Sequence, residues 1–385
     1  MAFFISDNII SSLGFTTAEN FENLIKGVSG ITKITDKLFY PEPFPASLIN
    51  QSRLDACFTE DENKSLTKLE KMIILSVKSS LEQTEVDIKS EKTLIILSTT
   101  KGNIDLLSNN TDYPIDRSRV LLWKLGEVIR NYFDNPNKTL VISNACISGV
   151  LALNNATMLL KNNKFENIVV TGGDIISRFV VSGFMSFMSL SPSACKPFDK
   201  NRDGLSLGEA ASTIILSRNK TGQNDIVHLG GASANDANHI SGPSRTGEGS
   251  FIAIKKALKE SGLNTDEIDH ISAHGTATPF NDEMESIAID RHQLNEVPVS
   301  SFKGSYGHTL GAAGLVETSI LLHETRNNIM LKTAGFSELG VTKNIHVVDK
   351  TTEKELNTCL KMASGFGGSN AAMIIQKVIS KSIKK

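Results

Sequence analysis

Residues 139–149 read TLVISNACISG, an aliphatic run that gives way to small residues around Cys146. Residues 147–161 continue with apolar side chains at helical spacing. The change of period predicts a strand, a short turn and a helix, as in α/β folds. The Cys146 thiol would lie near a helix N-terminus, where free N–H groups and the helix dipole favour a thiolate. Taken alone, such a cysteine is more often a small buried apolar residue.

Further aliphatic runs bounded by polar or glycine residues predict buried strands. The predicted strands are residues 94–98, 139–143, 167–171, 212–217, 268–273 and 371–378. The predicted helices are residues 69–82, 147–161, 251–262 and 311–325. Their alternation indicates α/β layering through the whole chain.

Composition limits the class of function. The chain has 385 residues, 40% of them hydrophobic and 21% charged, with a formal net charge of −2. This balance is typical of a globular protein and gives no overall electrostatic reason to expect binding to nucleic acid. Because no apolar run approaches the ~18 residues of a membrane span, we also expect no membrane insertion.

Four cysteines are scattered along the chain without any Cys-x-x-Cys pair: Cys57, Cys146, Cys195 and Cys359. This spacing indicates neither a disulfide framework nor a structural zinc site. We therefore expect a reducing, cytoplasmic location.

His270 and His274 have the i, i+4 spacing of a helical zinc pair. Gly275 and Pro279 follow directly, and the preceding residues alternate as in a strand, so the segment predicts a strand that ends in a loop. The metal interpretation therefore fails, and His274 projects into a turn. A lone histidine in such a turn is a hydrogen-bonded polar residue without a catalytic role about as often as it is a catalytic residue.

His308 lies in the run GHTLGAAG, residues 307–314, whose small residues predict a helix that packs with its backbone close to a neighbour. A helix N-terminus disfavours the imidazolium, so His308 is expected to be neutral and to donate one N–H to a carbonyl oxygen. Lys303 and Glu317 flank it, and an ion pair between them would be a scaffold. Gly149 is expected to let an acyl chain or a partner strand approach closely.

With these segments and three others, the chain resembles the β-ketoacyl-acyl carrier protein synthases, elongating condensing enzymes of the thiolase fold. The six ordered motifs are residues 143–149, 196–204 with 208–210, 235–243, 274–279, 303–314 and 364–371. The resemblance implies an acyltransferase that condenses malonyl-carrier protein with a cysteine-bound acyl group in fatty acid or polyketide synthesis.

By the resemblance, Cys146 accepts the acyl group, and its N–H and that of Phe366 form the oxyanion hole. His274 and His308 bind the malonyl thioester carbonyl, promote decarboxylation and stabilise the enolate. Lys303 and Glu317 support them. The resemblance implies no metal and no other cofactor, because the substrates are carried on the phosphopantetheine of the carrier protein.

The resemblance also implies residues that contact the substrate or permit a gate to move. Thr276 and Thr278 would contact the pantetheine arm, and Phe184 the acyl chain. Gly365 and Gly367 would let Phe366 swing between them.

The resemblance further implies a five-layered α/β/α/β/α thiolase-like fold with two pseudo-equivalent halves, residues 1–233 and 234–385. It implies a dimer through the first half, either a homodimer or a heterodimer with a related subunit. The acidic carrier protein should meet a basic surface, for which Lys64, Lys68 and Lys71 are the candidates, although a plain solvated helix face fits them equally.

Two other functions compete with the synthase. A non-catalytic, chain-length-setting partner subunit generally lacks the nucleophile, and a cysteine hydrolase would not explain Phe366 and His308 together. A thiolase would carry a second cysteine where this chain has Gly365-Phe366-Gly367, and a starter-type synthase an asparagine in place of His308. The opening strand, FISDN at residues 4–8, departs from the family's glycine-rich pattern, and this departure bears on substrate choice.

Overall fold

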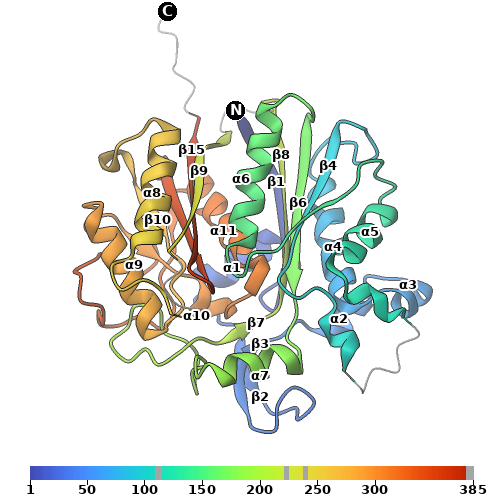
Figure 1. Cartoon of the computed structure of the whole chain (residues 1–385), viewed down its shortest axis with the longest axis horizontal. Helices are drawn as coiled ribbons and strands as arrows, with labels where there is room; N and C mark the ends of the chain where they lie inside the picture. Colours follow the sequence, from blue (N-terminus) through green and yellow to red (C-terminus); the bar gives the residue numbers. More distant parts are fainter. Residues whose placement is uncertain (109–114, 221–224, 237–241, 379–385) are drawn as a thin grey trace, which may run out of the picture.

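The structure, a computed structural model, describes residues 1–108, 115–220, 225–236 and 242–378. Within these residues, a ten-stranded sheet divides into a first and a second half, joined where β1 and β9 pair antiparallel (Figure 1). The strands of the first half, in sheet order, are β1 (Ala2–Ser11), β8 (Ala210–Ser217), β6 (Asn167–Asp174), β4 (Thr93–Ser98) and β5 (Leu140–Ile142). Those of the second half are β9 (Ile226–Asn235), β15 (Ser369–Lys377), β14 (Thr358–Gly365), β10 (His270–Ser272) and β11 (Val299–Ser300).

The two halves repeat one pattern of strand directions. In the first half, β8 pairs antiparallel with both β1 and β6, whereas β6, β4 and β5 run parallel. In the second half, β15 pairs antiparallel with both β9 and β14, whereas β14, β10 and β11 run parallel. The repeat confirms the expected pair of related halves.

The boundary between the halves was expected after residue 233, which lies inside β9. Since β9 pairs along its length with β15, the whole strand goes with the second half. We propose a boundary between Ser217, where β8 ends, and Ile226, where β9 begins.

Helices form three layers around the two half-sheets (Figure 1). The layers are α4 (Lys68–Leu81) with α5 (Leu122–Tyr132), α6 (Ser148–Lys161) with α11 (Ala313–Asn327), and α8 (Glu248–Ser261) with α9 (Pro279–Arg291). The pair α6 and α11 lies between the half-sheets and packs against both, whereas the other two pairs cover the outer faces. This arrangement confirms the predicted five layers.

The strand sequences dictate this layering. Successive side chains of a strand point to opposite faces, so a fully apolar strand suits a sheet covered on both sides. In β4, Leu94 and Ile96 pack in the central cluster, whereas Ile95 and Leu97 pack under α4 and α5. The aliphatic runs of β4, β6 and β8 are therefore buried on both faces. The run at residues 139–143 is the exception to the predicted buried strands, because it forms the edge strand β5, in which Leu140 is exposed and Val141 and Ile142 are half-buried.

Shorter elements complete the fold. They are α1 (Thr17–Ile25), β2 (Ile31–Ile34), β3 (Phe44–Ser47), α2 (Gln51–Asp55), α3 (Glu60–Ser65), η1 (Ile104–Leu107), η2 (Arg117–Val120), α7 (Arg178–Ser186), β7 (Leu207–Gly208), η3 (Thr265–Glu267), α10 (Lys303–Tyr306), η4 (Leu310–Ala312), β12 (Ile329–Met330) and β13 (Thr352–Glu353). The small sheet β2-β3-β7 and α7 share one apolar cluster.

The opening strand carries a buried carboxylate that pairs with α11. Asp7 is buried in β1 and lies 2.7 Å from Arg326 Nη1 and 3.2 Å from His323 Nε2, both on α11. Burial by itself would raise the pKa of Asp7, but Arg326 and His323 outweigh it and hold the pKa below its usual range. The strand thus fixes the C-terminal part of the helix that begins beside His308.

Candidate active site

Cys146 lies in a tight turn between β5 and α6, as the sequence predicted. Ser148 Oγ accepts the N–H of Asn144 (2.8 Å) and donates to the carbonyl of Ala145 (2.6 Å). Ala145 has a φ of 44°, which is uncommon for a residue with a Cβ. The two hydroxyl bonds hold this conformation and leave the Cys146 side chain at the start of the helix.

Helices α6 and α11 approach each other through glycine. A Cβ on Gly149 would lie 2.8 Å from a backbone nitrogen of α11, and one on Gly314 would lie 2.5 Å from a backbone nitrogen of α6. The expectation that Gly149 makes room for an acyl chain or a partner strand is therefore wrong, because α11 occupies that space. Since α6 follows Cys146 and α11 follows His308, this contact sets the spacing between thiol and imidazole.

The structure brings together the predicted thiol and both imidazoles. His274 follows β10, and His308 lies between α10 and η4. One side-chain ligand atom from each of Cys146, His274 and His308 lies within 4.8 Å of the others, and all three residues are buried. The centroids of the two imidazole rings are 5.1 Å apart and their planes are inclined by 82°.

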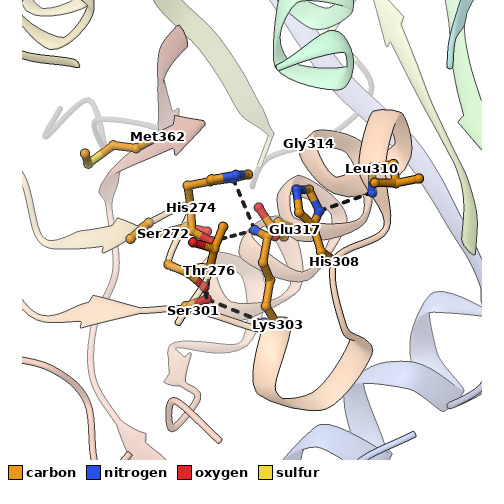
Figure 2. A network of polar contacts seen from close by, with 12 residues as sticks. Ser272, His274, Thr276, Ser301, Lys303, His308, Leu310, Gly314, Glu317 and Met362 are labelled. Carbon is orange, nitrogen blue, oxygen red and sulfur yellow. Dashed lines mark hydrogen bonds and ion pairs between the residues drawn. The ribbon is translucent and has the colours of Figure 1, made fainter. Parts of the chain in front are cut away.

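Each imidazole accepts a hydrogen bond at Nδ1 (Figure 2). The donor is the Lys303 ammonium for His274 and the backbone N–H of Leu310 for His308, each at 3.2 Å. Neither an ammonium nor a backbone N–H can accept a hydrogen bond, so a neutral ring must carry its proton on Nε2. Both rings line the cavity described below, and they can offer it two Nε2–H donors.

Burial shifts the titration of all three groups. Burial, followed by the charge of Lys303, lowers the pKa of both His274 and His308 well below its ordinary value. Burial raises the pKa of the Cys146 thiol to about 11, with Lys303 and Lys101 opposing the rise. At neutral pH the resting site therefore holds a thiol and two neutral imidazoles, and the thiolate favoured by the helix terminus is not its resting form.

Lys303 and Glu317 form the ion pair expected from the sequence, with Nζ and Oε1 2.5 Å apart and both side chains buried (Figure 2). A second lysine, Lys361 on β14, donates to the other oxygen of Glu317 over 2.6 Å and is fully buried. Sequence analysis missed Lys361, although one signal was present. It is a charged residue between apolar neighbours, in TCLKMASG at residues 358–365, where a buried strand is expected to carry none.

Two buried carboxylates at the start of α9 hold the loop that carries His274. Glu285 accepts the N–H groups of His274 (2.7 Å) and Gly275 (2.6 Å), and Asp282 accepts that of Thr276 (2.9 Å). Burial raises the pKa of Glu285 to about 7 and that of Asp282 to about 6. The structure assigns both acids to positioning the loop that carries His274.

A cavity of about 430 Å³ opens onto the trio. It is lined by Cys146, His274, His308 and by the expected substrate contacts Thr276, Thr278, Phe184, Gly365, Phe366 and Gly367, among others. The hydroxyls of Thr276 and Thr278 bond to each other over 2.8 Å. All the residues expected to contact substrate thus share one cavity with the thiol.

Phe366 lies at the end of β14 beside the nucleophile. A Cβ on Gly365 would lie 3.1 Å from the Cys146 backbone nitrogen, so this segment passes directly over the turn. The Phe366 ring contacts two other phenylalanine rings. The centroid of Phe184, in α7, is 5.7 Å away, and that of Phe187, the C-cap residue of α7, is 5.3 Å away. Phe187 is a further cavity residue that sequence analysis did not single out.

The three lysines considered for carrier docking do not form a free basic surface. Lys71 is buried and paired with Asp55, and Lys68 is paired with the buried Glu209 over 2.6 Å. Lys64 is exposed but paired with Glu60 over 2.6 Å. We therefore withdraw Lys68 and Lys71 as docking residues.

The thiol and imidazoles also form the kind of group that metal ions bind, although the sequence predicted no metal. Zinc favours cysteine and histidine ligands. Here, however, the Lys303 ammonium lies against His274, and Lys361 adds a second buried positive charge nearby. This charge opposes a further cation, and the absence of a metal stays a prediction.

Comparison with known proteins agrees with the geometry. The family models for the N-terminal and C-terminal domains of β-ketoacyl synthases match residues 8–222 and 226–337. A putative mitochondrial 3-oxoacyl-[acyl-carrier-protein] synthase of Schizosaccharomyces pombe is 28% identical, with 96% of this chain and 97% of that protein covered. The 3-oxoacyl-[acyl-carrier-protein] synthase 2 of Rhizobium meliloti is 27% identical, with the same coverage of 96% and 97%.

Solved structures show the same fold. A ketosynthase in complex with its chain length factor, from Xenorhabdus doucetiae, matches with a TM-score of 0.88 at 25% identity, covering 98% of each chain. A β-ketoacyl synthase from Burkholderia phymatum matches with a TM-score of 0.88 at 21% identity, covering 98% of this chain and 99% of that one.

Proposed function

This chain belongs to the β-ketoacyl synthase family of acyltransferases, and we propose that it condenses malonyl-carrier protein with an acyl group held on Cys146. The products are carbon dioxide and a 3-oxoacyl-carrier protein that is two carbons longer. The observation that carries the proposal is the convergence of one thiol with two imidazoles that offer Nε2–H donors. Such a set suits a covalent acyl intermediate followed by stabilisation of an enolate.

In the first step, Cys146 Sγ attacks the carbonyl of the incoming acyl thioester. The backbone N–H groups of Cys146 and Phe366 are the proposed oxyanion donors, supported by the passage of Gly365 against the Cys146 nitrogen. The carrier's sulfur leaves and takes up the proton that the Cys146 thiol loses. Because burial raises the pKa of this thiol to about 11, the thiol is the resting form and must lose its proton for the attack to occur.

In the second step, the malonyl thioester carbonyl accepts the Nε2–H groups of His274 and His308. The carboxylate leaves as carbon dioxide, and its bonding electrons form an enolate whose oxygen these donors stabilise. The enolate carbon then attacks the acyl carbonyl on Cys146. The Cys146 sulfur leaves and recovers a proton from water.

The cavity supports the proposed path of the pantetheine arm. Thr276 and Thr278 would bind its amides, because both residues line the cavity that contains the thiol. Phe184 and Phe366 lie in contact and would part to admit the acyl chain, with Gly365 and Gly367 allowing the backbone to turn.

We further propose that the chain forms a dimer through the first half. The edge strand β5 leads to Cys146, and its Leu140 is 40% exposed, as is Trp123, at 49%, on the neighbouring helix α5. An edge strand with apolar neighbours is suited to pairing with a second strand. The partner is a second copy or a related subunit, and the ketosynthase from Xenorhabdus doucetiae is in complex with its chain length factor. Light scattering on the purified chain would show whether it forms a homodimer.

A cytoplasmic location is also proposed. The four cysteines, all within the described residues, are unpaired, as expected in a reducing compartment. In the part of the chain that the structure describes, no helix is both long and apolar enough to cross a membrane. Cell fractionation tests the location.

Incubation of the purified protein with acyl-carrier and malonyl-carrier tests the reaction. We expect an acyl adduct on Cys146 by intact mass and a product two carbons longer, both abolished in Cys146→Ala. Release of free acid alone would indicate a hydrolase. Binding of both carriers without any adduct would indicate a chain-length-setting subunit, a role that the retained Cys146, His274 and His308 disfavour.

A further inference from the structure

Lys361 ends in a cage of oxygen atoms. Its ammonium donates to the carbonyls of Met362 (2.8 Å), Ser272 (3.3 Å) and Ala273 (3.3 Å) and to Glu317 Oε2 (2.6 Å). The side chain has no exposed surface. Four oxygens thus surround one buried ammonium, which has only three protons to share among them.

This set of four oxygen acceptors resembles a cation site more than an ordinary ion pair. Neutral carbonyls and one carboxylate are the ligands that hard cations prefer. Burying an ammonium is costly unless its surroundings compensate, and here Glu317 and the carbonyls do so. Burial lowers the pKa of Lys361, and the charge of Glu317 opposes that change.

The cage is built from the segment that presents His274. Ser272 ends β10, and Ala273 directly precedes the imidazole, so two of the four oxygens belong to its own backbone. Glu317, the fourth, also pairs with Lys303, whose ammonium contacts His274 Nδ1. Lys361 therefore acts on His274 indirectly in two ways. It holds the backbone that precedes the imidazole, and it shares the carboxylate of Glu317 with Lys303.

Loss of the Lys361 charge would affect both routes. With one oxygen of Glu317 unpaired, its full negative charge would act on Lys303 and compete with His274 Nδ1 for that ammonium. The carbonyls of Ser272 and Ala273 would lose their donor, which loosens the end of β10. Catalysis would suffer because an imidazole must be placed closely to stabilise an enolate.

We propose that Lys361 is a positioning residue whose ammonium acts as a tethered monovalent cation, neutralising Glu317 and fixing His274. This inference rests on the proposed role of His274 in condensation. It implies that truncating the side chain creates a site for a free monovalent cation. Ammonium is the best probe, since it carries the same charge and the same kind of N–H donor as the lost group.

The test compares Lys361→Ala, which opens the cage, with Lys361→Met, which fills it with an uncharged chain. In buffers of a tetramethylammonium salt, we expect kcat for condensation to fall about 100-fold in both, with smaller changes in KM. Ammonium chloride should restore Lys361→Ala at least about 10-fold, with saturation, and should raise its Tm. Potassium chloride is the second probe, and Lys361→Met should respond to neither.

The matched control is Lys354→Ala. Lys354 also donates to a carbonyl of this region, that of Asp269 over 2.9 Å, but it is partly exposed and makes no contact with Glu317. Wild type and this control should keep full activity and show no ammonium response. Should Lys361→Ala not fold, Lys361→Gln replaces it, because the amide retains donors without the charge and should still lower kcat.

Three results would overturn the proposal. The first is a wild-type kcat and pH profile for Lys361→Ala or Lys361→Gln in tetramethylammonium buffer. The second is a folded, inactive Lys361→Ala that ammonium neither stabilises nor reactivates. The third is equal rescue by tetramethylammonium. If wild type itself lacks condensing activity, the proposed function fails, whereas the ammonium-dependent rise in Tm still tests the cation site.

Discussion

The contact between α6 and α11 makes Gly314→Ala an informative change. The added Cβ would lie 2.5 Å from the backbone nitrogen of Val150, whereas an ordinary carbon–nitrogen contact is about 3.5 Å. The obstacle is backbone, which cannot rotate away, so the helices must separate by about 1 Å at this point. His308 precedes α11 and Cys146 precedes α6, so imidazole and thiol would move apart.

The expected cost follows from that displacement. Overpacking costs about 1–3 kcal/mol, and replacing a helical glycine by alanine returns about 1 kcal/mol. The net loss of stability is therefore modest, on the order of 1 kcal/mol. A misplacement of about 1 Å in an active site can reduce kcat about 100-fold. We expect a large fall in condensation for a small fall in Tm.

Condensation should be followed by the mass of the product carrier, and acylation by the adduct on Cys146. Gly183→Ala is the stability control, because Gly183 lies in helix α7 and its Cβ would meet nothing within 4 Å. Acylation of Gly314→Ala should be affected less than condensation, since only the latter requires His308. Wild-type condensation in a folded Gly314→Ala would refute the idea that this contact sets the catalytic spacing.

Three further predictions concern single groups. His308→Ala removes one Nε2–H donor, so condensation should fall about 100-fold or more while the acyl adduct on Cys146 still forms; an equal loss of both, measured by intact mass, would contradict the assigned role. The rate constant for alkylation of Cys146 by iodoacetamide should still be rising with pH at pH 9, because burial raises the thiol pKa to about 11. The rate is read from the peptide that contains Cys146, which excludes the exposed Cys57. A plateau near pH 7 would mean that an imidazole already holds the proton. Asp7→Asn should destabilise the fold at neutral pH, because the pKa of Asp7 is lower in the folded protein than in the unfolded chain. The resulting stability is present above the unfolded pKa and is lost as the pH falls through the folded pKa. The free energies of unfolding of wild type and Asp7→Asn, measured by urea titration, should therefore converge in strong acid, and a constant difference at all pH values would exclude the ion pair as the cause.

Local pattern marked the candidate reacting groups, and the order of the motifs along the chain gave them their roles. The aliphatic run before Cys146, the glycines after it and the small residues around His308 are short-range features, and each places its side chain at the end of a strand or the start of a helix. Their order along the chain, together with Phe366, indicated the family. The structure then gathered all of them at one cavity.

The lysines show where local pattern is insufficient. Lys64, Lys68 and Lys71 share one stretch of sequence, yet two of them are held by acids, Asp55 and Glu209, that only the fold brings near. A charged residue's partner can lie anywhere in the chain, so exposure cannot be deduced from spacing. The same holds for Lys361, whose oxygen cage combines β10, β14 and α11.

The sequence by itself determined the layered α/β architecture, because strand and helix periods are encoded within a few residues, and it identified the nucleophile and the two imidazoles through the order of six motifs along the chain. Only the tertiary structure decided the protonation of the site. Burial keeps the thiol and the two imidazoles neutral. Lys303 and Leu310 place the proton of each imidazole on its Nε2, and Lys361 supplies the second positive charge beside Glu317. These properties depend on desolvation and on partners distant in sequence, which no local pattern records.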